Sequence, residues 1–222
     1  MFARVAPPLF IALAVSYWVT LFLPAWAGEP VHKALPMLLA AWALLVSLPA
    51  RVGVPMAIGF AFSAAGDAFL AVDRQAWLLH ALASFLVTQL AYSAAFLHHA
   101  VPLRERLAPR LAAVGFGAAM LAWMWDGLGD FRVPVTVYVA VLVSMTVLAA
   151  GVGAGIGRVF VGAALFMLAD SLIGVNRFVT EFEHAERIIV AIYTTGQYLI
   201  FTGALAVYGR PPAGAARQGE PE

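Results

Sequence analysis

The apolar residues of this chain are grouped in long continuous runs, and polar residues do not alternate with them. A helix needs about 20 apolar residues to cross the hydrocarbon core of a bilayer, with roughly 17–25 tolerated. The runs therefore predict an all-α, polytopic membrane protein, because strands of a membrane barrel would alternate apolar and polar positions. About eight transmembrane helices are expected, at residues 7–24, 34–49, 54–72, 76–97, 109–125, 133–151, 157–176 and 187–208.

The first run has a second interpretation. An arginine, the apolar stretch Leu9–Leu23 and the sequence Ala25-Trp26-Ala27 also fit a secretory signal with an A-x-A cleavage site. We favour a retained first helix. A chain cut before Gly28 would have Lys33 at a membrane boundary almost at its start. Residues 1–210 are expected to form a single transmembrane domain.

The composition supports a membrane protein and excludes several kinds of functional site. Of 222 residues, 63% are hydrophobic and 11% are charged. In soluble domains about 45–50% of the residues are apolar and about 25% are charged. The net charge of +1, without a basic cluster, gives no reason to expect a nucleic-acid partner. The absence of cysteine excludes disulfides, thiolate metal sites and cysteine nucleophiles. The histidines show no H-E-x-x-H or i, i+4 pair, so neither a metal nor a cofactor is predicted.

The distribution of positive charge predicts an orientation. The connections on the side of the N-terminus carry eight Lys and Arg residues, and those on the opposite side carry five. Because cytoplasmic loops are enriched in Lys and Arg, we expect a multi-pass protein of the cell (inner) membrane with both termini in the cytoplasm. Residues 211–222, rich in Pro, Gly and Ala, are predicted to be a disordered cytoplasmic tail.

Two predicted helices carry an aspartate within an apolar run. Asp67 lies in the stretch Gly59–Arg74, and Asp170 lies in Gly162–Arg177. When the two aspartates are superposed, the glycines and arginines at the ends of both stretches align. The sequence therefore indicates a repeat around two intramembrane carboxyls.

Other segments extend this repeat. Lys33-Ala-Leu-Pro36 opens the second span and Arg132-Val-Pro134 opens the sixth. The fourth span carries Gln89 and Tyr92, and the eighth carries Gln197 and Tyr198. We therefore predict a four-plus-four duplication with halves at residues 1–100 and 109–208. Four spans in each half give both halves the same orientation in the membrane.

Both carboxyls are candidates for catalysis. An aspartate inside a bilayer costs about 2.5–3.5 kcal/mol and usually faces a cavity or a partner. Asp67 and Asp170 each lie 13 residues into their runs, about 20 Å along the helix, so they could share one site. Two such carboxyls could supply a general acid and a general base together. The alternative is that each aspartate only ties neighbouring helices together.

Seven further residues are predicted to bind substrate. Tyr193 and Gln197 enter the membrane from the outer side and could reach the level of Asp170. Small residues beginning at Ser63 leave room near Asp67. Three cations at outer helix ends either snorkel to the interface or form a rim for a phosphate headgroup. The predicted binding residues are Lys33, Ser63, Arg74, Asn176, Arg177, Tyr193 and Gln197.

Several motifs together resemble the YhhN-like lysoplasmalogenase family. They are H-K-A-L-P at 32–36, F-S-A-A-G-D at 62–67, L-F-M-L-A-D-S-L at 165–172 with N-R-F at 176–178, and Y-T-T-G-Q-Y-L-I at 193–200. The resemblance implies an eight-helix membrane enzyme that hydrolyses the vinyl ether bond of lysoplasmalogens to a fatty aldehyde and a glycerophospho-headgroup. It also implies that Asp67 and Asp170 are the catalytic pair. The sequence departs from the family at Gln89, where we expect a histidine.

The leading hypothesis is a membrane hydrolase that acts on a lysophospholipid substrate, with membrane lipids as its surroundings. Vinyl ether hydrolysis begins with proton transfer to carbon, and water captures the resulting oxocarbenium ion. Two carboxyls suit that chemistry, as they do in glycosidases. A proton-coupled transporter that uses the same aspartates is the alternative, and a non-catalytic membrane scaffold is a third possibility.

Overall fold

The computed structural model describes residues 2–98, 100–153 and 155–209, and within these ranges all regular structure is helical. The predicted all-α fold is confirmed; the predicted disordered tail lies outside the described residues. The helices are α1 (Phe2–Thr20), α2 (Glu29–Ser47), α3 (Ala50–Val72), α4 (Leu78–Leu97), α5 (Leu107–Met124), η1 (Trp125–Gly127), η2 (Gly129–Phe131), α6 (Arg132–Ala149), α7 (Arg158–Phe178) and α8 (Ala185–Tyr208).

The helices from α2 to α8 are long and apolar enough to cross a membrane, so the protein is a multi-pass membrane protein. The part of the first helix from Arg4 to Thr20 is just too short to be counted with them, and the helix packs against α2 and α8. Its Phe10 and Tyr17 side chains are fully buried there, and the Phe10 ring stacks on Phe201 of α8. Whether residues 1–27 are retained stays a prediction.

The second helix begins earlier than predicted. It starts at Glu29, whereas the sequence indicated residue 34. Proline is compatible with a first helical turn because the N–H that it lacks has no partner there, so Pro30 does not delay the start. As a result Lys33 lies inside the helix with 6% of its surface exposed, which does not fit the snorkelling alternative.

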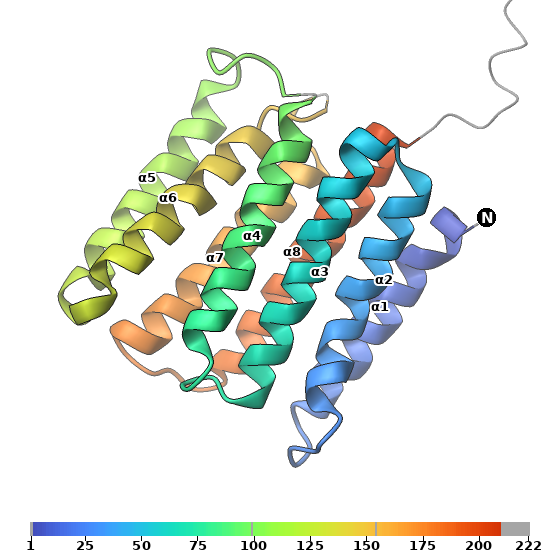
Figure 1. Cartoon of the computed structure of the whole chain (residues 1–222). Coiled ribbons are helices and arrows are strands. Elements are labelled where there is room, and N and C mark those ends of the chain that lie inside the picture. The colour runs from blue at the N-terminus through green and yellow to red at the C-terminus, as the bar shows by residue number, and fades with distance from the viewer. Residues whose placement is uncertain (1, 99, 154, 210–222) are drawn as a thin grey trace, which may run out of the picture.

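The packing order agrees with the predicted duplication (Figure 1). The contacts of α1 with α2, α2 with α3 and α3 with α4 recur as contacts of α5 with α6, α6 with α7 and α7 with α8. Between the halves, α4 packs on α6 as α8 packs on α2. The residue limits of the two halves stay a prediction.

The repeated glycines mark close helix contacts in both halves. A Cβ atom on Gly59 would lie 2.4 Å from the Tyr92 ring of α4. A Cβ atom on Gly162 would lie 2.6 Å from the carbonyl oxygen of Gly196 in α8. Small residues allow helices in membranes to approach closely, so these positions hold α3 against α4 and α7 against α8.

The four connections after α1, α3, α5 and α7 lie at one end of the bundle, which we name the mouth end (Figure 1). There the Asp73 carboxylate accepts backbone hydrogen bonds from Gln75 and Ala76, which lower the pKa of Asp73. At the opposite, closed end, the Arg106 guanidinium donates to carbonyl oxygens between Ala150 and Gly155.

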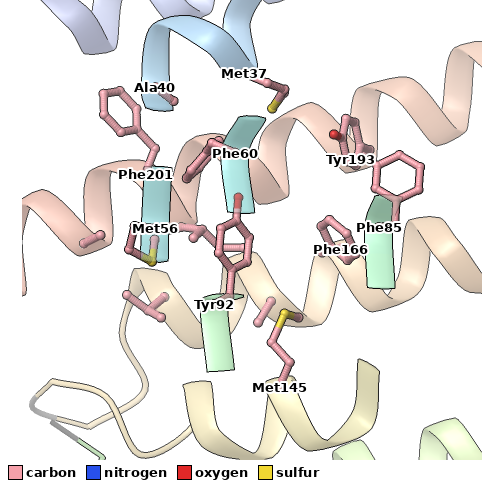
Figure 2. Packing of buried hydrophobic residues seen from close by; sticks show 14 of the residues in the cluster. Met37, Ala40, Met56, Phe60, Phe85, Tyr92, Met145, Phe166, Tyr193 and Phe201 are labelled. Atoms are coloured by element: carbon pink, nitrogen blue, oxygen red, sulfur yellow. The ribbon is translucent and has the colours of Figure 1, made fainter. Parts of the chain in front are cut away.

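The largest side chains of the core are aromatic residues and methionines contributed by both halves (Figure 2). Phe60, Tyr92 and Phe201 pack in its centre, where Phe60 lies 5.3 Å from Tyr92 and 6.3 Å from Phe201 between ring centroids. Met145 of α6 is fully buried beside Tyr92. These side chains fill the part of the bundle that is nearer the closed end. The polar groups described below lie in the part that is nearer the mouth end.

Candidate active site

Asp67 is buried near the mouth-end terminus of α3, with 2% of its surface exposed. The phenol of Tyr193 on α8 donates a 2.8 Å hydrogen bond to its Oδ2 atom. Lys33, the only lysine in the sequence, is the cation whose charge acts most strongly on this carboxyl. Asp67 is therefore held by one hydrogen-bond donor from α8, and the charge of Lys33 on α2 acts on it through space.

A buried hydrogen-bond network continues from Tyr193 toward the closed end. The amide nitrogen of Gln197 donates to the Ser63 hydroxyl at 2.8 Å and to the Tyr193 phenol oxygen at 3.4 Å. The Gln197 carbonyl oxygen accepts a 2.9 Å bond from Tyr92, and Ser63 donates to Thr88 at 3.3 Å. These bonds fix the position of Tyr193 and, through it, of Asp67.

Asp170 on α7 has a different set of neighbours. The Tyr138 phenol on α6 donates to its Oδ2 atom, and the Gln89 amide nitrogen on α4 lies 3.5 Å from the same oxygen. The Gln89 carbonyl oxygen is buried and has no hydrogen-bond partner. Sequence reasoning missed Tyr138, although a lone tyrosine in a valine-rich apolar helix is a recognisable signal. Gln89, which the sequence marked only as part of the repeat and as a departure from the family, reaches Asp170.

An inner cavity lies against Asp170. Its volume is about 50 Å³, well below the roughly 300–1,000 Å³ of small-molecule sites, so it is a narrow cavity. Its wall is almost entirely apolar, with Leu82, Phe85 and Val139 among the lining side chains. Tyr138 and Asp170 also line it, and Arg177 stands at its edge. Asp67 is not part of this wall, so the structure brings only one of the two carboxyls to the cavity.

A second cavity, the mouth cavity, adjoins the first and shares Leu70, Leu78, Ile173 and Arg177 with it. All three predicted rim cations line it, together with carboxylates and an amide, and the charged or amide-bearing residues are Lys33, Arg74, Gln75, Asn176, Arg177, Glu181 and Glu186. The structure thus places positive and negative groups at the entrance to an apolar chamber.

Three of these mouth residues already have partners within the protein. Arg74 forms an ion pair with Glu186 of α8, and both side chains are 37% exposed. The Asn176 side-chain oxygen accepts a 3.1 Å bond from the backbone N–H of Phe182, which closes the connection after α7. Asn176 therefore has a structural role in addition to its place at the cavity.

Three residues predicted to bind substrate lie behind the cavity wall. Ser63, Tyr193 and Gln197 belong to the Asp67 network and do not line either cavity described above. The sequence indicated their height along the helices, but it did not indicate the face on which each side chain lies. Any role of these three residues in the site would act through Asp67.

An aromatic cluster connects the two carboxyl environments (Figure 2). The ring of Tyr193 lies 6.0 Å from Phe85 and 5.7 Å from Phe166, between centroids. Phe85 also lines the inner cavity beside Asp170. Asp67 is among the charges that act on Asp170, so the two carboxyls are close enough to interact through space.

The repeat is asymmetric at the point where the cavity forms. In the first half, α2 packs along much of α3, and this contact encloses Asp67. In the second half, α6 contacts α7 more sparsely, and the space between them is lined by Tyr138, Leu142 and Asp170. Looser packing of one helix pair therefore opens Asp170, but not Asp67, to a ligand.

Comparison with known proteins identifies the family. The sequence profile of the YhhN family matches residues 28–204. The chain belongs to the YhhN family. A lysoplasmalogenase of Mycobacterium tuberculosis is 33% identical over 79% of this chain and 69% of its own length. The human lysoplasmalogenase TMEM86A is 29% identical over 89% of this chain and 87% of its own length.

An uncharacterized membrane protein of the same family, YhhN from Escherichia coli O157:H7, is 25% identical over 86% of this chain and 95% of its own length. No solved structure matches this YhhN-family chain. Relatives named as enzymes cover most of the sequence. Together with the family match, they identify the protein as a membrane-embedded hydrolase.

Proposed function

We propose that this YhhN-family protein hydrolyses the vinyl ether bond of lysoplasmalogens, releasing a fatty aldehyde and a glycerophospho-headgroup. The observation that carries the proposal is the position of Asp170. Its carboxyl lies on the wall of an apolar cavity that continues into a charged mouth. A single-chain phospholipid has the same order of groups, with a charged head, a vinyl ether just below it and an apolar chain. The names of the relatives support this substrate.

Distances along α7 support the placement of the lipid. Arg177 lies seven residues beyond Asp170, which corresponds to about 10 Å along a helix. In a lysoplasmalogen, seven bonds separate the phosphorus from the vinyl carbon that receives the proton. At about 1.25 Å of advance per bond in an extended chain, that distance is roughly 9 Å. A phosphate held at Arg177 would therefore bring the reacting carbon to the level of Asp170.

The Asp170 carboxyl suits the role of proton donor. Tyr138 and Gln89 both direct their donors at Oδ2, which leaves Oδ1 for the cavity. The protonated carboxyl transfers its proton to the β-carbon of the vinyl ether, where a C–H bond forms as the π bond breaks. The positive charge is then shared by the α-carbon and the ether oxygen.

The second step returns the proton. Water attacks the α-carbon of the oxocarbenium ion and gives a proton to the Asp170 carboxylate. The resulting hemiacetal then breaks its bond to the glycerol oxygen. The hemiacetal hydroxyl loses a proton to form the aldehyde, and the glycerol oxygen takes up a proton. One carboxyl can therefore complete the cycle, with water as the only co-reactant.

Asp67 acts on the same reaction from behind the wall. Its carboxylate, held by Tyr193 and paired electrostatically with Lys33, stabilises the cationic intermediate through space. Preorganised charge in a water-poor site can be the largest contribution to catalysis. In this proposal Asp67, Tyr193, Gln197 and Ser63 are positioning residues, and Asp170 is the catalytic one.

The mouth cavity is proposed to bind the headgroup. Lys33, Arg74 and Arg177 would meet the phosphate, while the carboxylates beside them fit an ammonium group. In the cell membrane the mouth end would face away from the cytoplasm, with both termini inside, as the distribution of Lys and Arg indicates. Labelling of single introduced cysteines on intact cells tests this orientation, because the sequence has none of its own.

A proton-coupled transporter is the competing function. It would need a path from the mouth end of the bundle to the closed end. The cavities described here lie in the half nearer the mouth, and Tyr92, Phe96 and Met145 are fully buried in the other half. This arrangement favours a hydrolase with one entrance over a transporter.

The test is release of fatty aldehyde from a lysoplasmalogen by the purified protein. We expect Asp170→Asn to lower kcat at least 100-fold, and Asp67→Asn to lower it about tenfold. The control is Asp130→Asn, an exposed aspartate of η2, which should keep the wild-type rate. Full activity in both site variants would rule out the mechanism. An inactive wild type that moves a substrate into proteoliposomes would instead establish transport, and loss of stability without any activity would indicate a scaffold.

A further inference from the structure

Lys33 has surroundings that are unusual for a lysine. It is the only lysine in the sequence, and 6% of its surface is exposed. Its Nζ atom lies 5.8 Å from the centroid of the Tyr17 ring, and among the described residues it has no hydrogen bond or ion pair. Lysine is almost never buried unless it is paired. A phosphate headgroup would pair with this amine only while it is bound, so the amine is free at other stages of the reaction.

The amine can be reached from the mouth cavity. Lys33 lines this cavity together with Arg74 and Glu186. The Nζ atom is not among the fully buried side-chain atoms that lack a hydrogen-bond partner. Since it has no such partner, it must keep some accessible surface. A molecule in the mouth cavity can therefore contact the amine.

The charges around Lys33 suit a reactive amine. Burial and a neighbouring cation are the two features that make a lysine nucleophilic, and Arg74 is among the charges that act on Lys33. The carboxyl of Asp67 acts on it more strongly. Asp67 can take a proton from the ammonium, and its carboxylate can stabilise a positive charge that stays on the nitrogen. Buried lysines of this kind form Schiff bases with carbonyl compounds.

The proposed reaction supplies a carbonyl compound next to this amine. It forms a fatty aldehyde at Asp170, in an inner cavity that shares four wall residues with the mouth cavity. The aldehyde carbon was bonded to the headgroup side of the substrate, so it is the part of the product nearest the mouth. The mouth cavity has a volume of about 170 Å³, whereas a water molecule needs about 10–15 Å³. It therefore has room for an aldehyde group once the glycerophospho-product has left.

We propose that Lys33 is a site of covalent modification, which captures long-chain fatty aldehydes as a protonated imine. The Lys33 ammonium gives a proton to Asp67, and the free amine forms a C–N bond to the aldehyde carbon as the C=O π bond breaks. A proton moves from nitrogen to oxygen and gives a carbinolamine. Asp67 returns its proton to the hydroxyl group, which leaves as water while the C=N bond forms. The positive charge remains on nitrogen beside the Asp67 carboxylate.

This inference rests on the proposed function for the source of the aldehyde. An alkyl chain on Lys33 would occupy the cavity that is proposed to bind the headgroup. The released aldehyde should therefore inhibit the protein reversibly, by blocking the entry of the next substrate molecule.

Reductive trapping tests the capture without any turnover. The full-length wild-type protein in dodecyl maltoside micelles is incubated with hexadecanal and sodium cyanoborohydride, which reduces an imine to a stable secondary amine. Mass spectrometry of the intact protein and its peptides then locates each hexadecyl group. We expect Lys33 to be modified at least tenfold faster than the α-amino group of the chain. Equal rates, or modification of the α-amino group alone, would overturn the proposal.

Two variants control for ordinary lysine chemistry. Lys33→Arg keeps the positive charge and should lower the modification of internal peptides at least tenfold. The double variant Lys33→Arg/Arg132→Lys places an exposed amine at the same end of the bundle, outside both cavities. It should be modified at least tenfold more slowly than the wild type. Equally fast modification of this double variant would show that the mouth cavity has no part in the reaction, and would also overturn the proposal.

The experiment separates the two ideas because the aldehyde is added from outside. A wild type that releases no aldehyde from a lysoplasmalogen, yet is modified at Lys33 by hexadecanal, would refute the proposed function and support the capture site. A wild type that releases aldehyde but is not modified at Lys33 would refute the capture site alone.

Discussion

The phenol of Tyr193 on α8 donates a 2.8 Å hydrogen bond to the carboxyl of Asp67 on α3, and so joins residues 126 positions apart in the sequence. A second tyrosine, Tyr138 of α6, donates to Asp170 of α7. Each of the two carboxyls is therefore oriented by a phenol from another helix. Neither phenol follows from the repeat, because the two tyrosines come from helices that are not equivalent in the two halves.

Tyr193→Phe tests the first of these bonds. A buried acceptor that loses its donor is destabilised by about 1–3 kcal/mol, and Asp67 would lose its orientation. We expect kcat for aldehyde release to fall about tenfold with KM changed less than twofold, because Tyr193 does not line the cavity. Tyr198→Phe on the same helix is the control and should keep both constants. A change in KM alone would show that Tyr193 contacts substrate.

Lys33 and Asp67 should be energetically coupled. Lys33→Met leaves a buried carboxylate without its cation, and Asp67→Asn leaves a buried ammonium without its anion. Each single variant is expected to unfold more easily than the wild type. The double variant should regain part of the loss, with a coupling energy of about 0.5–3 kcal/mol. Unfolding in detergent micelles measures all four proteins, and strictly additive effects would mean that the two charges do not interact.

The ion pair of Arg74 with Glu186 should matter for binding more than for stability. Pairs this exposed contribute about 0.2–1 kcal/mol. Arg74→Ala should therefore lower the melting temperature only slightly, while raising KM for a lysophospholipid about fivefold if Arg74 meets the phosphate. Arg132→Ala, a cation stacked on Trp125 away from both cavities, is the matched control. Equal KM values for the two variants would remove Arg74 from the headgroup site.

Gly162 should tolerate no side chain. A Cβ atom there would meet the carbonyl oxygen of Gly196 at 2.6 Å and the backbone nitrogen of Ile200 at 2.7 Å. Gly162→Ala would thus push α7 away from α8, and overpacking of this kind costs about 1–3 kcal/mol. Gly115→Ala, with nothing within 4 Å, should be neutral or slightly stabilising because alanine favours a helix. Thermal unfolding in detergent compares them, and equal melting temperatures would contradict the close contact.

Much of the fold follows from local sequence. Apolar runs long enough to span a bilayer must satisfy their own backbone hydrogen bonds, and a helix does so without any partner. The positions of α3 to α8 were therefore predictable to within a few residues. The start of α2 was not, because the apolar run that predicted this span begins only after Lys33, whereas the helix begins at Glu29.

The sequence by itself determined that the protein is a bundle of membrane helices with two carboxyls, Asp67 and Asp170, inside apolar segments. Charge in an apolar run is visible along the chain, because its desolvation is costly wherever the helix packs. Only the tertiary structure decided that Asp170 lines a cavity while Asp67 stands behind its wall. That difference arises because α2 packs closely on α3 while α6 contacts α7 only sparsely, and such helix contacts depend on residues far apart in the chain.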